Sequence, residues 1–257
     1  MPYKNHYLTN VILRIDFLTP VSELKNQLNK EISDVCTQFF PIKEERKLQT
    51  KQVVVSNDPE LKNTVVNTEN LSEWHFFDLK REKELCITDK CILVDFRKYT
   101  SFNDLKTPFM NIFEVLSNTY TEVGIKRVGL RYIDQIALDY EPVDNWFNYW
   151  KQYINDDLLY SLKFVENQKN ISRNMNTIEE NCGTYNFRYQ YGIFNTDYPA
   201  PNKKNTYILD TDVYYDGILD KEDMKKNIEI FHDEAKKLFE RSITDELRRK
   251  MEITDNV

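Results

Sequence analysis

Two aspartates near the C-terminal end of the chain offer the first candidate chemistry. Asp210 and Asp212 are separated by one residue in the segment LDTDVYYDG. On a β-strand, side chains two positions apart point to the same face, so both carboxylates would lie together. Such a pair could hold Mg²⁺ through oxygen ligands, as a metal-dependent hydrolase or nuclease requires. The third acid and the lysine expected at fixed spacing are missing, and if Leu209, Thr211 and Val213 face the core, the two acids simply face water.

Arginines close to acids on strand-like segments are the second candidate. Arg14 precedes Asp16 in VILRIDF, and Arg131 precedes Asp134 in VGLRYIDQI. A strand arginine can form a two-pronged pair with a carboxylate or with an anionic ligand. The alternative is a cross-strand ion pair that belongs to the sheet alone. Strand alternation places Arg14 and Asp16 on one face, whereas Arg131 and Asp134 share a face only if a bulge lies between them.

Aromatic residues offer two further candidates for binding. Arg188 lies in the segment TYNFRYQYGIF, where an aromatic strand could stack nucleobases. Its aromatic residues alternate onto one face, which favours a core face instead. Trp146 and Tyr149 precede Trp150 on a predicted helix and could anchor a protein interface, because Trp and Tyr dominate binding hot spots. Core packing is the alternative for these residues, most strongly for Trp150.

Other catalytic groups are scarce. The histidines are His6, His75 and His232, and none has a second histidine at metal-ligand spacing. The cysteines are Cys36, Cys86, Cys91 and Cys182, and no CxxC pair occurs among them. No GxSxG motif marks a serine nucleophile. The residues therefore favour a non-enzymatic protein without a cofactor, with cysteines that are reduced.

Hydrophobic periodicity gives the elements that would position these residues. We expect strands over 11–17, 52–56, 73–80, 84–88, 91–98, 127–138, 162–166, 172–179, 184–194 and 206–215. We expect helices over 20–39, 102–120, 142–158 and 221–239, the first capped by Thr19, the second by Ser101 and the last by Asp220. The charged segment 42–51 is predicted to be solvated, and 57–70 to form a long loop.

The two halves of the chain show the same order of elements. Arg14 and Arg131 occupy corresponding places on the opening strands, at an offset of 131 − 14 = 117. Asp95 and Asp212 give the same offset of 117, and the helix caps Ser101 and Asp220 give 119. This pattern predicts an α+β fold, a tandem pseudo-repeat of β-α-β(3–4)-α with curved antiparallel sheets covered by helices. The predicted halves are 1–122 and 123–257, joined in one compact unit as in saddle-like or helix-grip folds.

Composition narrows the function classes. The chain has 257 residues, 13% aromatic residues and a formal net charge of 35 − 42 = −7. The aromatic content argues against disorder, and only 5 Gly argue against glycine-rich phosphate loops. Negative net charge opposes phosphate contacts, so nucleic acid ranks below a protein partner. Neither a signal peptide nor a membrane span is evident, and we expect a cytoplasmic protein without membrane contact.

Four segments carry a resemblance to a known family: VILRIDF, VGLRYIDQI, LDTDVYYDG and FHDEAKKLFERSITDELRRKM. The chain resembles a sporadically distributed family of bacterial proteins of about this length and of unknown function. The most specific segment is GLRYID, where family members often have Asn at the position of Asp134, followed by the final helix with Phe239, Ile243 and Thr244. The resemblance brings no catalytic residues. Its sporadic occurrence implies horizontal transfer and a bacterial defence or toxin–antitoxin type operon.

The leading hypothesis is a non-enzymatic cytoplasmic module that binds a protein partner, encoded in the same operon, or senses a ligand. Its candidate binding residues are Arg14, Arg131, Asp134, Trp146, Tyr149 and Arg188. The alternatives are a hydrolase built on Asp210 and Asp212 and a saddle that binds nucleic acid. Homo-oligomer formation is left open.

Overall fold

A computed structural model describes residues 3–54, 65–121, 123–139, 141–200, 202 and 204–252, with backbone only at 50–54 and 65–70. Nine strands form one antiparallel sheet in the order β2-β3-β4-β5-β1-β6-β9-β8-β7, which is not closed into a barrel. The strands are β1 (Leu8–Phe17), β2 (Ile42–Val54), β3 (Val65–Phe77), β4 (Lys83–Ile87), β5 (Cys91–Phe96), β6 (Ile125–Leu138), β7 (Asn174–Asn181), β8 (Asn186–Ile193) and β9 (Asn205–Leu219). The predicted α+β class is confirmed.

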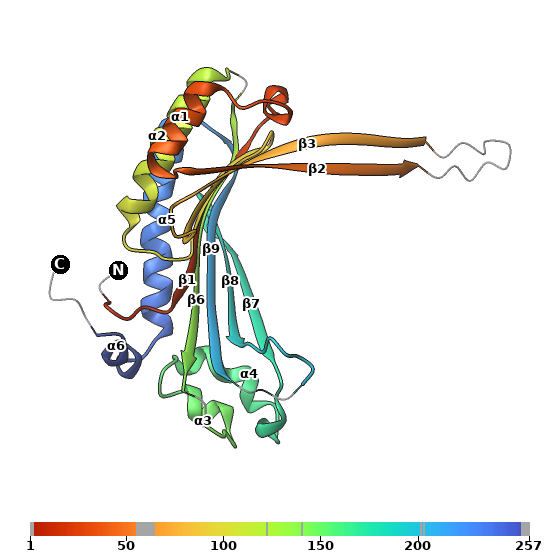
Figure 1. Cartoon of the computed structure of the whole chain (residues 1–257). Helices are drawn as coiled ribbons and strands as arrows, with labels where there is room; N and C mark the ends of the chain where they lie inside the picture. The colour runs from red at the N-terminus through yellow and green to blue at the C-terminus, as the bar shows by residue number, and fades with distance from the viewer. Residues whose placement is uncertain are drawn as a thin grey trace.

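One face of the sheet is covered by helices. The helices α1 (Lys30–Phe39), α2 (Phe102–Thr119) and α5 (Lys221–Ser242) pack along it (Figure 1). Alternate residues of the central strands supply the apolar surface beneath them, and Leu13 of β1 lies opposite Leu130 of β6, both fully buried. The two-residue alternation of VILRIDF thus produces a covered face and an open face from the same strand.

The main helices begin where their capping residues predict. The Ser101 side chain accepts a hydrogen bond from the Asp104 backbone nitrogen at 3.1 Å, and Asp220 accepts one from the Asp223 nitrogen at 2.7 Å. These contacts satisfy backbone donors that the first helical turn leaves free. The apolar residues of α2 recur at helical spacing and are buried against the sheet: Leu105, Phe109, Ile112, Phe113 and Leu116.

A second hydrophobic cluster lies at the end of the sheet beside α3 (Trp146–Trp150) and α4 (Tyr160–Lys163). Trp150 is fully buried and its ring lies 5.2 Å from that of Tyr207, centroid to centroid. The short helix α6 (Asp245–Met251) adds residues to the same cluster. Aromatic residues thus close one end of the sheet.

The expectations for the N-terminal half fail in three places. Segment 42–51 belongs to β2, which pairs with β3 over its whole length, and both strands run outward as a long arm (Figure 1). Of the predicted loop 57–70, residues 65–70 lie in β3, and 57–64 lie outside the described residues. The helix expected from Thr19 is a 3-10 turn over Ser22–Lys25, and α1 begins later, after the cap Asn29.

Two further elements differ in the C-terminal half. The strand expected at 162–166 overlaps α4, because a short apolar run does not distinguish a strand from a buried helical turn. The helix expected over 142–158 is divided into α3 and the 3-10 turn Asp156–Leu159. The predicted boundary between 122 and 123 precedes β6, and strands from both sides of it join one sheet. None of the helices in the described part of the chain has the length and apolar character needed to cross a bilayer.

Candidate functional site

The face of the sheet opposite α1, α2 and α5 is the candidate site, and we call it the open face. Figure 1 shows no helix over its middle within the described residues. Asp210 and Asp212 lie on it because Leu209, Thr211 and Val213, which alternate with them in β9, are buried on the covered face. The prediction that the two acids share a face is correct. The other charged residues of this face include Arg14, Asp16, Asp95, Arg127, Arg131, Arg188 and Asp216.

Ion pairs connect these residues across three strands. Arg131 donates from Nε and Nη2 to the two carboxylate oxygens of Asp210, at 2.7 and 2.6 Å. Arg127 Nη2 lies 3.2 Å from Asp212 Oδ2, and Arg127 Nη1 lies 3.9 Å from Asp16 Oδ2. Arg14 Nη2 lies 2.6 Å from Asp16 Oδ1 on the same strand. The pairs therefore hold the guanidinium groups in fixed positions above the sheet.

The arginines also determine what Asp210 and Asp212 can do. The hydrogen bond from Arg131 to Asp210 raises the pKa of the arginine. Burial raises the pKa of Asp212, while the charges of Arg127 and Arg131 act to lower it. A divalent cation at Asp210 would have to displace the two-pronged pair with Arg131. Within the described residues, no group of three His, Cys, Asp or Glu side chains is arranged to hold a metal ion.

In two of these pairs the arginine is clearly the more exposed partner. The Arg14 side chain is 44% exposed against 20% for Asp16, and Arg131 is 40% exposed against 11% for Asp210. The arrangement continues toward the arm, where Arg97 is 57% exposed above Glu84 at 16%. Arg127, by contrast, is buried about as deeply as Asp212. Much of the outermost layer of the open face is therefore guanidinium.

The open face toward the arm contains His75 on β3. Its Nδ1 lies 2.7 Å from Glu84 Oε1 and its Nε2 lies 3.2 Å from Glu73 Oε2, so two carboxylates hold the ring. The thiol of Cys86 lies 3.8 Å from His75 Nε2. Burial raises the pKa of this thiol to about 12, which keeps it protonated at neutral pH. The Cys86–His75 contact therefore lacks the thiolate that a nucleophile requires.

The other predicted binding residues lie in three different places. Arg188 is on the open face, with its Nε 3.8 Å from Glu179 Oε1 on the neighbouring strand. Asp134 lies on the covered face, so it does not accompany Arg131, and burial raises its pKa to about 8. Trp146 and Tyr149 are 4% and 8% exposed within the second cluster, where they contribute packing rather than a free surface.

Sequence reasoning missed Arg127 and the polar residues at the far end of β6. Arg127, Arg131 and Gln135 have even spacing along one strand, which was a usable signal for a shared face. The pairing of Arg131 with Asp210 had no such signal, because it depends on the register between β6 and β9. The open face therefore joins residues that are far apart in the sequence.

The end of the open face beyond Arg131 and Asp210 contains a small polar pocket. Gln135 of β6 and Thr206 of β9 line it together with the segment that follows β8. Larger hollows of about 390 and 470 Å³ lie beside Trp146 and Tyr149.

A scan against protein-family models finds no match to this chain, and a search of curated proteins finds none either, so the family resemblance stays a prediction.

Proposed function

We propose that the protein is a non-catalytic binding module that holds a protein partner on the open face. The observation that carries this proposal is the layer of ordered guanidinium groups on a sheet face left uncovered by the helices. Arginine is enriched in protein interfaces and is one of the main hot-spot residues. Because Asp16 and Asp210 already fix Arg14 and Arg131, a partner would order few further side-chain torsions on binding.

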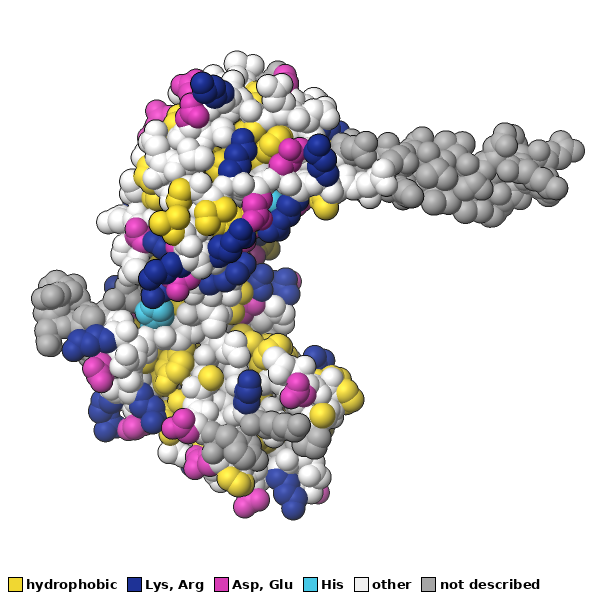
Figure 2. All heavy atoms as spheres, in the orientation of Figure 1, with side chains coloured by type: hydrophobic (Ala, Val, Ile, Leu, Met, Phe, Trp, Pro, Cys, Tyr) yellow, Lys and Arg dark blue, Asp and Glu magenta, His cyan; other side chains and the backbone are white. Residues whose placement is uncertain are grey.

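The shape of the molecule supports the same proposal. Figure 2 shows that its outline is hollowed between the arm formed by β2 and β3 and the end that carries α3 and α4. Lys and Arg side chains gather where the arm meets the body (Figure 2), and Arg46 and Arg81 are among the paired residues there. An arm and a hollow beside one charged face would give a partner contacts on more than one side.

The charge balance favours protein over nucleic acid as the partner. The chain carries a formal net charge of −7, and the arginines of the open face are paired with carboxylates. Binding to phosphate backbones depends on unneutralised positive charge, which releases counterions. A protein surface of mixed charge can instead exchange partners with these ion pairs. Asp210 serves in this proposal as the support of Arg131 and not as a metal ligand.

We also propose that the two halves are related by duplication. Leu13 and Leu130 lie opposite each other, at an offset of 130 − 13 = 117, which fits a two-fold axis between β1 and β6. Ile12 pairs with Asp95, and Gly129 pairs with Tyr214. The offset 214 − 95 = 119 matches that of the helix caps. Tyr214, and not Asp212 as the sequence offset of 117 suggested, would therefore be the counterpart of Asp95, while Arg14 and Arg131 would be equivalent positions.

The test compares two charge variants of the full chain during co-expression with the products of the neighbouring genes. The open-face variant combines Arg14→Gln, Arg131→Gln and Arg188→Gln. The matched control combines Lys226→Gln and Lys237→Gln, which are exposed on α5. We expect one gene product to co-purify with the wild type and with the control, and its affinity for the open-face variant to fall at least about a hundredfold, since each lost arginine anchor costs about 1–2 kcal/mol.

Three outcomes would contradict the proposal. The first is that no neighbouring product binds at micromolar concentration. The second is equal binding to both variants while both remain folded at the temperature of the assay. The third is co-purification of nucleic acid that falls steeply with salt and depends on the same arginines, which would assign the open face to nucleic acid.

A further inference from the structure

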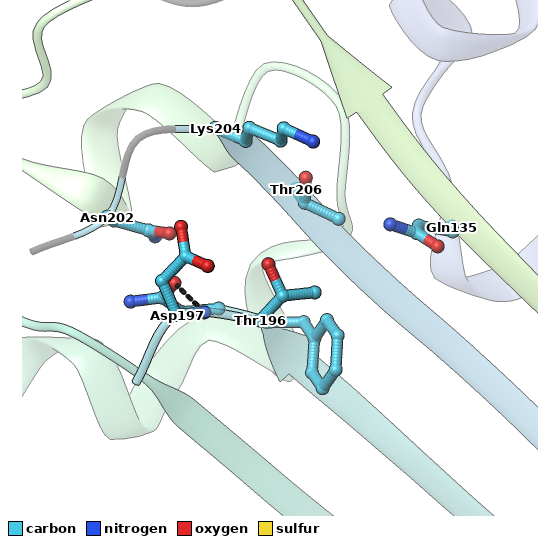
Figure 3. A pocket seen from close by; sticks show the side chains of 8 residues that line it. Gln135, Thr196, Asp197, Asn202, Lys204 and Thr206 are labelled. Atoms are coloured by element: carbon cyan, nitrogen blue, oxygen red, sulfur yellow. Dashed lines mark hydrogen bonds between the residues drawn. The ribbon is translucent and has the colours of Figure 1, made fainter. Parts of the chain in front are cut away.

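The small pocket beyond Arg131 and Asp210 is built almost entirely from polar side chains. Figure 3 shows them around one space, contributed by β6, by β9 and by the segment between β8 and β9. Its lining residues are Gln135, Phe194, Asn195, Thr196, Asp197, Asn202, Lys204 and Thr206. The volume is about 40 Å³, enough for a group the size of one or two water molecules.

Hydrogen-bond donors of this pocket have no acceptor within the described part of the protein. Thr206 is 2% exposed, and its side chain lines the space (Figure 3). The Asn202 Nδ2 atom is buried and has no partner among the described residues. No carboxylate of a described residue lies within ion-pair distance of Lys204 Nζ, which faces the same space (Figure 3). A buried donor without an acceptor costs about 1–3 kcal/mol, so the Asn202 amide favours an acceptor supplied from outside. Lys204 is exposed and adds a positive charge beside it.

The frame of the pocket is fixed by hydrogen bonds. Asn195, which is buried, accepts from the Asp197 backbone nitrogen at 2.9 Å and donates to the Ala200 carbonyl oxygen at 2.8 Å. The backbone nitrogen of Phe194 donates to the Thr206 carbonyl oxygen at 3.1 Å. These hydrogen bonds fix the segment 194–200 and join it to β9 at Thr206, so this part of the frame is formed before any ligand binds.

We infer that this pocket binds a carboxylate group. A carboxylate provides two acceptor oxygens for the hydroxyl, amide and ammonium donors, and a negative charge for Lys204. It also fits the volume, whereas a nucleobase or a sugar ring is too large. Asp197 also lines the pocket, and its carboxylate opposes the charge of the ligand (Figure 3), so the hydrogen-bond donors rather than the net charge define the site.

The source of the carboxylate follows from the position of the pocket. Thr206 and Gln135 continue the open face from Asp210 and Arg131 along β9 and β6. A partner on that face could insert its C-terminal carboxylate or an Asp or Glu side chain. Only this choice of source rests on the proposed function, because binding of a free carboxylate needs no partner.

The experiment titrates the ¹⁵N-labelled full chain with three short peptides, acetylated at the N-terminus. Acetyl-tetra-alanine has a free chain end, acetyl-Ala-Glu-Ala-amide has only a side-chain carboxylate, and acetyl-tetra-alanine amide has neither. The readout is the backbone amide shift of Thr206, Lys204 and Thr196. We expect millimolar binding of one acid or both, which identifies the source, and no shift with the neutral peptide.

Four variants connect the binding to the named donors. We expect Lys204→Met and Thr206→Val each to weaken the acid about fivefold or more, the effect of losing about 1 kcal/mol. The matched control Lys226→Met, on α5, should bind as the wild type does. Asp197→Asn should bind the acid more tightly, because it removes the opposing charge. Equal shifts with acid and neutral peptides, or unchanged affinity in Lys204→Met and Thr206→Val, would overturn the inference.

The two proposals fail separately. If the open-face variant keeps the partner while peptide binding is unchanged, the open-face proposal fails and the carboxylate pocket is retained. If no peptide shifts the amide signals while partner binding still depends on Arg14 and Arg131, the pocket inference fails and the open-face proposal is retained.

Discussion

The two faces of the sheet differ although the same strands form both. On the covered face Leu13 and Leu130 meet beneath helices, and apolar contact stabilises the fold. On the open face the neighbouring positions Arg14 and Arg131 are held by carboxylates and stay about half exposed. A shift of one residue along the strand separates a packing role from a binding role. A charged side chain therefore opposes packing on the covered face, whereas on the open face it can take part in binding.

Two aspartates make this difference measurable. Asp134 is on the covered face, its Oδ1 atom has no hydrogen bond, and burial raises its pKa to about 8. Asp210 is on the open face and accepts two hydrogen bonds from Arg131. The first carboxyl group is protonated when folded at neutral pH, and the second has a cation beside it. Substitutions on the two faces should therefore change the free energy of unfolding by different amounts and with different signs.

The largest effect is expected from Leu130→Ala on the covered face. Removing a fully buried leucine side chain leaves a cavity and costs about 3 kcal/mol of unfolding free energy, within a usual range of about 2–5 kcal/mol. Urea denaturation would measure the loss, with Arg131→Met on the adjacent position as its counterpart. A smaller loss for Leu130→Ala than for Arg131→Met would break the comparison.

The second effect has the opposite sign and depends on pH. An aspartate has a pKa of about 3.9 when unfolded, and that of Asp134 is about 8 when folded. The folded state therefore holds the proton more tightly, and the unfolding free energy of the wild type falls as pH rises from about 4 to about 8. Asp134→Asn should remove this contribution and stabilise the protein at pH 8, where the wild type bears the cost of a buried carboxyl group that is losing its proton.

Thermal or urea unfolding of both proteins at pH values from about 5 to about 8 would test this expectation. The difference between variant and wild type should grow with pH. A difference that is constant, or that favours Asp134 at high pH, would show that the carboxylate is satisfied in the fold. Asn at this position is also what the family resemblance leads us to expect.

A smaller effect is expected from Arg131→Met on the open face. It leaves the largely buried carboxylate of Asp210 without its two hydrogen bonds, and we expect a loss of about 1.5 kcal/mol. The double variant Arg131→Met and Asp210→Asn should recover most of this loss, because the unpaired charge is gone. Equal stability of the single and double variants in urea would mean that the pair is not coupled.

The smallest effect is expected from Arg14→Met. Arg14 is 44% exposed and pairs with Asp16 on its own strand, so solvent screens the interaction. Exposed pairs contribute at most about 1 kcal/mol, and we expect a loss below about 0.5 kcal/mol that shrinks further in high salt. A loss as large as that of Arg131→Met would show that the ion pairs across the open face act as one network.

The elements of the covered face were predictable because helix caps and alternation are local signals. Ser101 and Asp220 identified the starts of α2 and α5, and VILRIDF identified β1. Segment 42–51 was misinterpreted because β2 extends into the arm, where the charged residues of KEERK give no apolar alternation. Thr19 failed as a cap because the side chain of Asn29 caps α1 instead.

The candidate site was predictable only in part, for a physical reason. Parity along one strand correctly placed Arg14 with Asp16 and Asp210 with Asp212, and separated Arg131 from Asp134. The partners of Arg131 and Arg127 depend on the register between strands about 80 residues apart in the chain, which no local pattern contains. The polar pocket depends in addition on the folded path of the segment between β8 and β9.

The central pairing of β1 with β6 has a consequence for synthesis of the chain. β1 leaves the ribosome before β6, which is one of its two neighbours, and Leu13 meets Leu130 only after a further 130 − 13 = 117 residues have been synthesised. Until then β1 is a sheet edge with an apolar face, the kind of surface that pairs with other chains. The strand order therefore requires that the exposed edge of β1 be protected, for example by a chaperone, until β6 has been synthesised.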